Sequence, residues 1–176
     1  MTCRSTRPSS GHAAIASAPD TDAQGHAHED LAVYLFEAVA GCWVERNLMN
    51  DFQTEEVDVA VGNDRLPEGL PILPHVVLVE CKDWSRSVDS RTLGYFINTL
   101  ANRSVEVGIL IATTGIAGQA VGRHAAALGI GAAARGMKVL VITKDDLVAL
   151  TSTEDFIEMV SRRYLRAVAS GTIGLP

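Results

Sequence analysis

Two oppositely charged side chains interrupt the end of an apolar segment. Residues 76–83 read VVLVECKD, so Glu80 and Lys82 follow a run of four apolar residues. In an extended strand, alternate side chains point to the same face, which sets this carboxylate beside this ammonium group, with Cys81 opposite. Burying an unpaired charge is costly. The pair therefore indicates a functional site. A salt bridge between the two side chains at the end of a strand is the simpler alternative.

A further carboxylate precedes this pair in the chain. Residues 55–62 read EEVDVAVG, with the valines on one face of a strand and Glu56 and Asp58 on the other. If this strand and the next pair as a hairpin across the Pro- and Gly-rich residues 63–74, Asp58 approaches Glu80. Neighbouring carboxylates repel one another unless something neutralises them.

A divalent cation would neutralise Asp58 and Glu80. Carboxylate oxygens are hard ligands that suit Mg²⁺ or Mn²⁺. Such an ion lowers the pKa of a bound water molecule and offsets the charge that builds up on an attacked phosphate. Lys82 would then orient or help to deprotonate that water and stabilise the pentacovalent phosphate.

Hydrophobic periodicity predicts the elements that position these residues. Predicted strands cover residues 43–48, 55–62, 75–84, 107–115 and 137–143. Predicted helices cover residues 28–40, 88–102, 117–132, 144–150 and 153–168. This order begins as α+β and ends with alternating strands and helices. We therefore expect an α/β fold, a mixed sheet of about five strands flanked by helices.

The two ends of the chain lack this periodicity. Residues 1–25 are rich in Ser, Ala, Pro, Gly and His, and we expect a flexible tail there. The histidines at positions 12, 26 and 28 are interpreted as solvated rather than metal-binding. We expect one folded domain over residues 26–170 and a short C-terminal tail over residues 171–176.

Composition excludes several classes of protein. The chain has 176 residues, is 47% hydrophobic and has a formal net charge of −6, which argues against global disorder and against a nucleic-acid coat protein. It has no apolar run long enough for a transmembrane helix and no secretory signal, so no membrane association is expected. Three cysteines without a CxxC pair favour reduced thiols in the cytoplasm. Lys82 is one of only three lysines.

The order Asp58, then Glu80-Cys81-Lys82, resembles the core of the PD-(D/E)xK nuclease superfamily, and in particular the Mrr-type restriction endonuclease domain. Other segments agree with this resemblance: a helix follows the ExK strand, and GILIATTGIAGQAVGRHAAALGI and VLVITKDDLVAL resemble the family's later strands and helices. Glu29 precedes Gly41 in the first helix, as that group's glutamate does. The similarity spans residues 28–150.

The resemblance implies roles for individual residues. Asp58 and Glu80 would bind the metal, with the backbone carbonyl of Cys81, and Lys82 would be the catalytic lysine. Glu29 would be an accessory ligand or would hold a ligating water.

Some of these roles have alternatives. Glu37 is the rival of Glu29 on the same helix. The family's polar residue on the helix after the ExK strand is often Gln or Lys, and here Arg91 and Asn98 are the candidates for substrate binding. Trp84 is a further candidate, for stacking on a base or ribose, and packing against the sheet is its simpler role.

The implied function is a Mg²⁺- or Mn²⁺-dependent endonuclease that hydrolyses phosphodiester bonds of DNA in restriction or defence. We expect targeting to come from a homo-oligomer or a partner protein, and weak DNA binding by the chain alone. Three arginines of the final helix, at positions 162, 163 and 166, form a basic patch or a solvated face. The alternatives are a catalytically inactive interaction or regulatory module with a nuclease fold, and an enzyme that cleaves RNA or a small phosphodiester.

Overall fold

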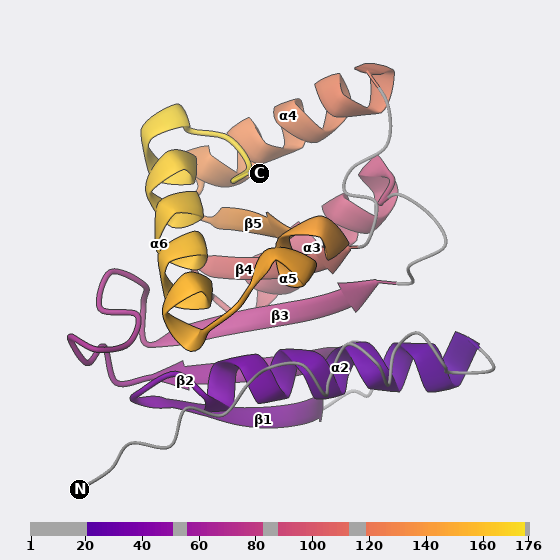
Figure 1. Ribbon diagram of the computed structural model, residues 1–176. Helices are drawn as coiled ribbons and strands as arrows, with labels where there is room; N and C mark the ends of the chain where they lie inside the picture. Colours follow the sequence, from indigo (N-terminus) through magenta and orange to yellow (C-terminus); the bar gives the residue numbers. More distant parts are fainter. Residues whose placement is uncertain (1–20, 51–55, 83–87, 113–118, 175–176) are drawn as a thin grey trace, which may run out of the picture.

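The computed structural model describes residues 21–50, 56–82, 88–112 and 119–174, and its centre is a five-stranded sheet (Figure 1). The strands lie side by side in chain order, and the first three are antiparallel whereas β3, β4 and β5 are parallel. The mixed sheet predicted from the sequence is thus confirmed. Its strands are β1 (Cys42–Met49), β2 (Glu56–Asn63), β3 (Val76–Lys82), β4 (Val107–Ala112) and β5 (Lys138–Ile142).

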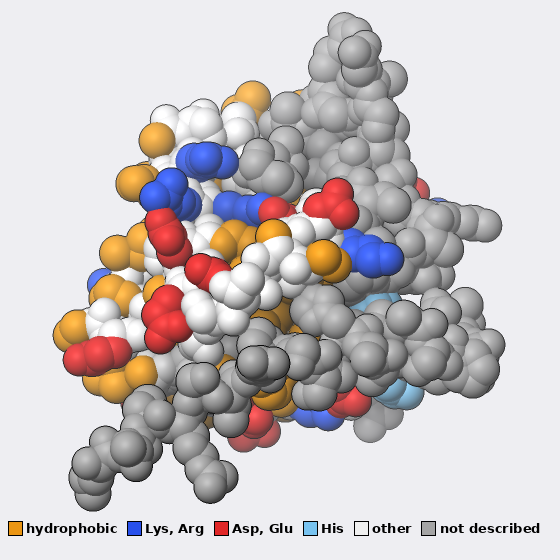
Figure 2. Space-filling model, in the orientation of Figure 1, with side chains coloured by type: hydrophobic (Ala, Val, Ile, Leu, Met, Phe, Trp, Pro, Cys, Tyr) orange, Lys and Arg blue, Asp and Glu red, His pale blue; other side chains and the backbone are white. Residues whose placement is uncertain are grey.

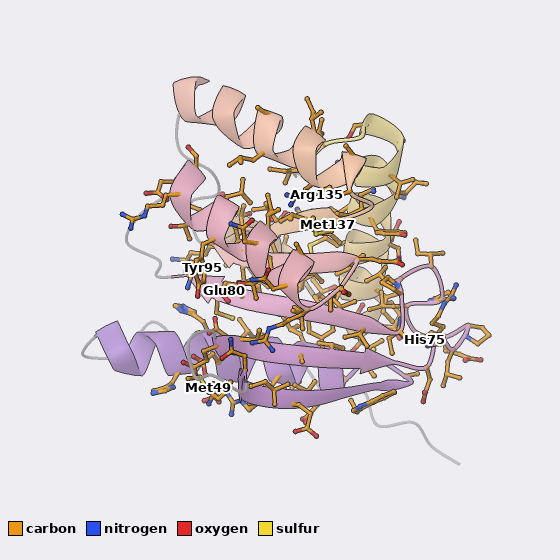
Figure 3. The ribbon with its side chains drawn as sticks, turned by 180° about the vertical axis from the view of Figure 1, so that it is seen from behind. Met49, His75, Glu80, Tyr95, Arg135 and Met137 are labelled. Carbon is orange, nitrogen blue, oxygen red and sulfur yellow. The ribbon has the colours of Figure 1, made fainter. Side chains whose placement is uncertain are left out.

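Helices cover both faces of this sheet. On one face, α2 lies over the antiparallel strands and α5 and α6 lie over the parallel ones (Figure 1). On the other face lie α3 and α4 (Figure 3). None of the helices in the described part of the chain is long and apolar enough to cross a bilayer. Their bounds are α2 (Thr21–Glu37), α3 (Ser90–Asn102), α4 (Gln119–Ala134), α5 (Lys144–Ala149) and α6 (Thr153–Ser170).

Each face of the sheet carries its own hydrophobic cluster. The first cluster joins α2 and α6 to the sheet, and there Phe36 and Phe156 meet edge to face with their ring centroids 5.1 Å apart. The second cluster lies beneath α3 and includes Phe96, Leu110 and Val139. Every residue of β4 is buried, as expected for a parallel strand covered by helices on both sides.

A buried asparagine fixes the connection between β2 and β3. Asn63 is 1% exposed, and its Nδ2 donates hydrogen bonds to the carbonyl oxygens of Leu70, Leu73 and Pro74 at 2.9, 3.4 and 3.2 Å. Carbonyl groups in a loop lack the main-chain hydrogen-bond donors that a helix or strand would supply. Here one side-chain amide donates to three of them instead. This loop therefore returns the chain in a defined position, which sets the register of β3 against β2.

The ends of the ordered region extend beyond the expected limits. Helix α2 begins at Thr21, so residues 21–25, expected in the flexible tail, are helical. The expectation that His28 is solvated is wrong: its side chain is only 2% exposed because the helix runs through this position. The remainder of the expected tail, residues 1–20, lies outside the described residues.

Residues 171–174, expected in a C-terminal tail, pair with the edge of the sheet. The amide of Val141 donates to the carbonyl of Gly174 at 2.9 Å, and the amide of Gly174 donates to the carbonyl of Val139 at 2.8 Å. A parallel bridge between Leu140 and Gly174 results. The outer edge of β5 is therefore covered by the chain's own later residues.

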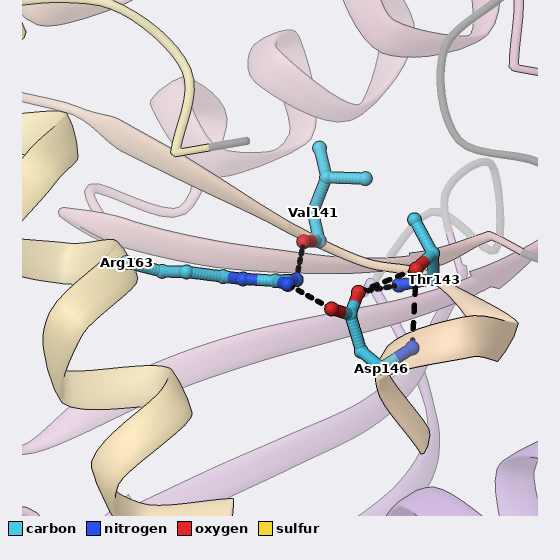
Figure 4. Close-up of polar contacts among 4 residues, drawn as sticks. All are labelled: Val141, Thr143, Asp146 and Arg163. Carbon is cyan, nitrogen blue, oxygen red and sulfur yellow. Dashed lines mark hydrogen bonds and ion pairs between the residues drawn. The ribbon is translucent and has the colours of Figure 1, made fainter. Parts of the chain in front are cut away.

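Arg163, predicted on the surface of the last helix, is instead buried at 4% exposure (Figure 4). Its guanidinium contacts the carbonyl oxygen of Val141 and the carboxylate of Asp146. That carboxylate also accepts a 2.7 Å hydrogen bond from the amide of Thr143, which caps the start of α5. Burial alone would raise the pKa of Asp146, but the bonds from Arg163 and Thr143 outweigh it and lower that pKa. Arg163 thus joins α6, α5 and β5.

Candidate active site

The candidate site lies where the pairing of β2 with β3 ends. The last paired residues are Val59 and Val79, and the same register sets Asp58 opposite Glu80. Beyond this point the amide of Cys81 donates a 2.7 Å hydrogen bond to Oδ2 of Asp58. A side-chain carboxylate, rather than a main-chain carbonyl, thus holds the amide of the neighbouring strand.

The side chains of β2 change faces at Asp58. Val59 and Val61 pack in the first hydrophobic cluster, whereas Val57 packs in the second. The expectation that all three valines share one face is therefore wrong. Pairing of β2 with β3 ends at Val59, so Asp58 lies at the point of change.

Glu80 and Lys82 lie on the same face of β3, as the alternation predicts. Lys82 Nζ contacts Oε1 of Glu80, and their side chains are 38% and 8% exposed. The salt bridge considered as the simpler alternative is therefore formed, but with its carboxylate buried. Figure 3 shows Glu80 on the side of the sheet that carries α3.

Burial dominates the protonation of these groups. It raises the pKa of Glu80 to about 7, and the charge of Asp58 adds to this effect while Lys82 opposes it. Burial also raises the pKa of Asp58, against the opposing effects of the Cys81 amide and of Lys82. For Lys82, burial alone would lower the pKa, but Glu80 and Asp58 outweigh it and raise the pKa. Lys82 is therefore a cation beside two carboxyl groups that both resist ionisation.

Glu29 of α2 also reaches this region. Its side chain is 15% exposed and lies 3.7 Å from Nδ1 of His26. Its pKa is raised by burial and then by the charge of Asp58, which places the two carboxylates within electrostatic reach of each other. Its rival Glu37 is exposed at the last residue of the helix. The structure thus brings Glu29, rather than Glu37, toward Asp58.

The thiol of Cys81 faces the first cluster and is unsuited to bind a metal. Burial, together with the charges of Asp58, Glu29 and Glu80, raises the pKa of this thiol well above its usual value. A thiol must lose its proton to act as a metal ligand. Only the backbone carbonyl of Cys81 therefore remains as a candidate donor.

The donor atoms of this site fit a hard divalent cation. Asp58 and Glu80 lie opposite each other in register, and each supplies carboxylate oxygens. No group of three or more His, Cys, Asp or Glu side chains with metal-binding geometry occurs in the described ranges of the chain. Magnesium usually takes one or two carboxylates and completes its shell with water and substrate phosphate. Two carboxylates and one carbonyl are therefore sufficient for such an ion.

The predicted substrate-binding residues are less well connected to this site. Arg91 and Asn98 are exposed on α3, on the same side of the helix as Tyr95. Among the described residues, neither Arg91 nor Asn98 contacts the carboxylates. Trp84 lies outside the described residues.

Most of the chain matches a known family. Residues 22–151, well over half of the chain, match the family model of the Mrr catalytic domain, described as restriction endonuclease. The chain belongs to the Mrr-type restriction endonuclease family. A search of curated proteins finds no match.

Membership of this family has direct consequences for function. The protein is a nuclease of the restriction endonuclease type, and DNA is the substrate that this domain implies. PD-(D/E)xK nucleases generally use divalent metals, in agreement with the oxygen donors of Asp58 and Glu80. The resemblance found in the sequence and the predicted endonuclease fold are both confirmed.

Sequence patterns did not identify one cation, Arg46, that lies next to α2. Arg46 of β1 lies on the side of α2, where its Nη2 is 2.5 Å from Oδ1 of Asp30. Asp30 directly follows Glu29. In the sequence, Arg46 is visible only as an arginine in the middle of a short predicted strand. No sequence pattern shows that this strand lies against α2.

Proposed function

We propose that this protein is a Mg²⁺- or Mn²⁺-dependent endodeoxyribonuclease of the cytoplasm that acts in restriction or defence. The observation that carries the proposal is the meeting of Asp58, Glu80 and Lys82 at the end of the β2–β3 pairing. These groups combine two oxygen ligands with one cation. That combination suits the hydrolysis of a phosphodiester.

Each side chain of the site would have a separate role in hydrolysis. Asp58 and Glu80, with the carbonyl of Cys81, would hold the divalent cation, which when bound activates water and offsets charge on the phosphate. Glu29 would hold a water molecule or act as an accessory ligand. Lys82 would orient the attacking water and stabilise the extra negative charge of the pentacovalent phosphate. The phosphorus–oxygen bond to the 3′ oxygen then breaks.

Cleavage of plasmid DNA tests this proposal. Wild-type protein, Lys82→Ala and Asp58→Asn would be incubated with supercoiled plasmid in Mg²⁺, Mn²⁺ or EDTA. Lys144→Ala serves as the matched lysine control, because Lys144 lies on the short helix α5 and outside the proposed site. We expect cleavage by the wild type and the control only, and only with metal. Cleavage that survives in both site variants would contradict the assignment.

One observation supports a second candidate, a catalytically inactive interaction module. Lys82 contacts the carboxylate of Glu80 directly, so each of these two charged groups has a partner without any ligand. Absence of cleavage of both DNA and RNA in every metal would favour this candidate. For either candidate we propose that a second copy or a partner protein supplies targeting.

A further inference from the structure

Arg46 presents a partly exposed guanidinium on the α2 side of the sheet, next to the helix that carries Glu29. The side chains of Arg46 and Asp30 are 39% and 67% exposed, so their ion pair is open to solvent. Exposed ion pairs stabilise a protein by about 0–1 kcal/mol. The free-energy cost of replacing Asp30 with another anion as the partner of Arg46 is therefore small.

The position of Arg46 relates it to the predicted catalytic groups. It pairs in register with Val59, which adjoins Asp58 in β2. Its partner Asp30 adjoins Glu29 in α2. The charge of Arg46 also lowers the pKa of Glu29, although less than burial and Asp58 raise it. Arg46 is thus a cation within electrostatic reach of the site and is not enclosed in it.

The negative net charge of the protein makes a cation near the site important for binding DNA. The net charge is −6, and the described side chains coloured in Figure 2 show acidic and basic groups interspersed rather than one continuous basic surface. A DNA backbone that enters the site meets Glu29, Asp30 and Asp58 on the way. Individually placed cations must offset this repulsion.

We propose that Arg46 binds a backbone phosphate of the DNA beside the site, and that this phosphate replaces Asp30 as its partner. The inference rests on the proposed function, because it takes DNA as the ligand. A guanidinium binds phosphate through two parallel hydrogen bonds, which one carboxylate partner does not prevent. In the free protein Asp30 holds the side chain of Arg46 in position.

The simpler alternative is that Arg46 and Asp30 only tie β1 to α2. The two roles predict different outcomes for the double variant. If the pair is only a tie, Arg46→Ala and Asp30→Asn change DNA binding only through the net charge, so their effects add in the double variant. If Arg46 binds phosphate, Arg46→Ala weakens binding while Asp30→Asn releases the guanidinium and tightens binding.

The experiment measures binding of a fluorescent DNA duplex by anisotropy, in Mg²⁺ and in the Lys82→Ala background so that the duplex is not cleaved. We expect Arg46→Ala to weaken binding roughly five- to tenfold and to reduce the slope of log K against log salt by about one. We expect Asp30→Asn to tighten binding. This gain should largely vanish in the Arg46→Ala background, because it acts through the guanidinium.

Two controls separate this effect from general changes in charge. Arg162→Ala removes a comparable ion-paired arginine from α6, where Arg162 lies 2.6 Å from Glu158, and binding should stay within twofold of the parent. Glu45→Gln neutralises an exposed acid of β1 next to Arg46. Its effect should be the same whether or not Arg46 is present. Circular dichroism and melting temperature verify that each variant is folded.

The outcomes distinguish this inference from the proposed function. Unchanged affinity and salt slope in Arg46→Ala, or tightening by Asp30→Asn that persists without Arg46, would overturn the inference even if the wild type cleaves DNA. In the otherwise wild-type enzyme, Arg46→Ala should raise KM with little change in kcat. A wild type that binds DNA through Arg46 but does not cleave it would support the inference and refute the proposed activity.

Discussion

The backbone amide of Cys81 donates a 2.7 Å hydrogen bond to the carboxylate of Asp58. This bond joins β3 to β2 just beyond their last paired residues, so it replaces the ladder that would otherwise continue. It also fixes one oxygen of Asp58 relative to the strand that carries Glu80 and Lys82. The geometry of the site therefore depends on a contact that a neutral amide side chain can reproduce.

Asp58→Asn and Asp58→Ala should differ in stability but not in activity. Asparagine retains an oxygen that accepts from the Cys81 amide, whereas alanine leaves this amide without its acceptor. We expect Asp58→Ala to lower the free energy of unfolding by about 1–3 kcal/mol and Asp58→Asn to lower it less. Both should lose metal-dependent cleavage. Urea unfolding and plasmid cleavage provide the two measurements, and equal stability of the variants would argue against the structural role of this bond.

Glu80→Gln should stabilise the metal-free protein at high pH. The folded-state pKa of Glu80 is raised to about 7 from an ordinary value of 4.5, so the stability present below pH 4.5 is lost as pH rises through 7. Glutamine does not ionise and avoids this loss. We expect a gain on the order of 1–3 kcal/mol at pH 8 that shrinks toward pH 5. Urea unfolding at both pH values checks it, and a gain independent of pH would exclude the ionisation of Glu80 as its cause.

Mg²⁺ should raise the melting temperature, and more at pH 8 than at pH 6. A cation held by Asp58 and Glu80 binds the folded state and not the unfolded state, so it stabilises the protein. It also competes with the proton that Glu80 holds below a pKa of about 7. EDTA should reverse the effect. In Asp58→Asn the shift should nearly disappear. An equal shift in this variant would place the bound metal elsewhere.

Arg163→Met should be far more destabilising than Arg162→Met. Arg163 is buried, and its loss leaves the carboxylate of Asp146 and the carbonyl of Val141 without their guanidinium partner. Removing one member of a buried ion pair typically costs about 3–5 kcal/mol. Arg162 is 69% exposed and should contribute less than about 0.5 kcal/mol. Chemical denaturation of both variants decides this, and similar losses would contradict the clamp between α6 and α5.

Gly62→Ala should displace Trp43 without unfolding the protein. A Cβ atom at Gly62 would overlap the indole of Trp43, which lies across it from β1. Because Trp43 is 51% exposed, it can move aside toward solvent. We expect a loss of about 1 kcal/mol and a red shift of tryptophan fluorescence. In Trp43→Phe, which keeps the other tryptophan, Gly62→Ala should leave the spectrum unchanged.

The sequence predicts much of this fold because its strands are regular. The apolar β4 and β5 and the alternating β2 were each located within a few residues. Strand alternation also predicted that Glu80 and Lys82 share a face.

Other features depend on contacts between distant residues, which no local pattern reveals. Arg163 resembles its exposed neighbours in the sequence, and only its position beneath α5 makes it a buried clamp. The switch of faces at Asp58 coincides with the end of the pairing with β3. The ion pair between Arg46 and Asp30 can be recognised only once β1 is placed against α2. Local propensity thus located the elements, whereas tertiary packing decided which charged groups are buried and paired.

The change from antiparallel to parallel pairing at β3 also has a kinetic consequence. β1, β2 and β3 follow one another in the chain and pair as local hairpins, which typically form in about 1–10 μs. β4 and β5 reach the sheet only after a helical crossover, and such non-local pairing is slower. Asp58, Glu80 and Lys82 all belong to the early hairpins. The proposed catalytic carboxylates should therefore come together before the parallel half docks, and closure of the parallel half should limit the overall folding rate.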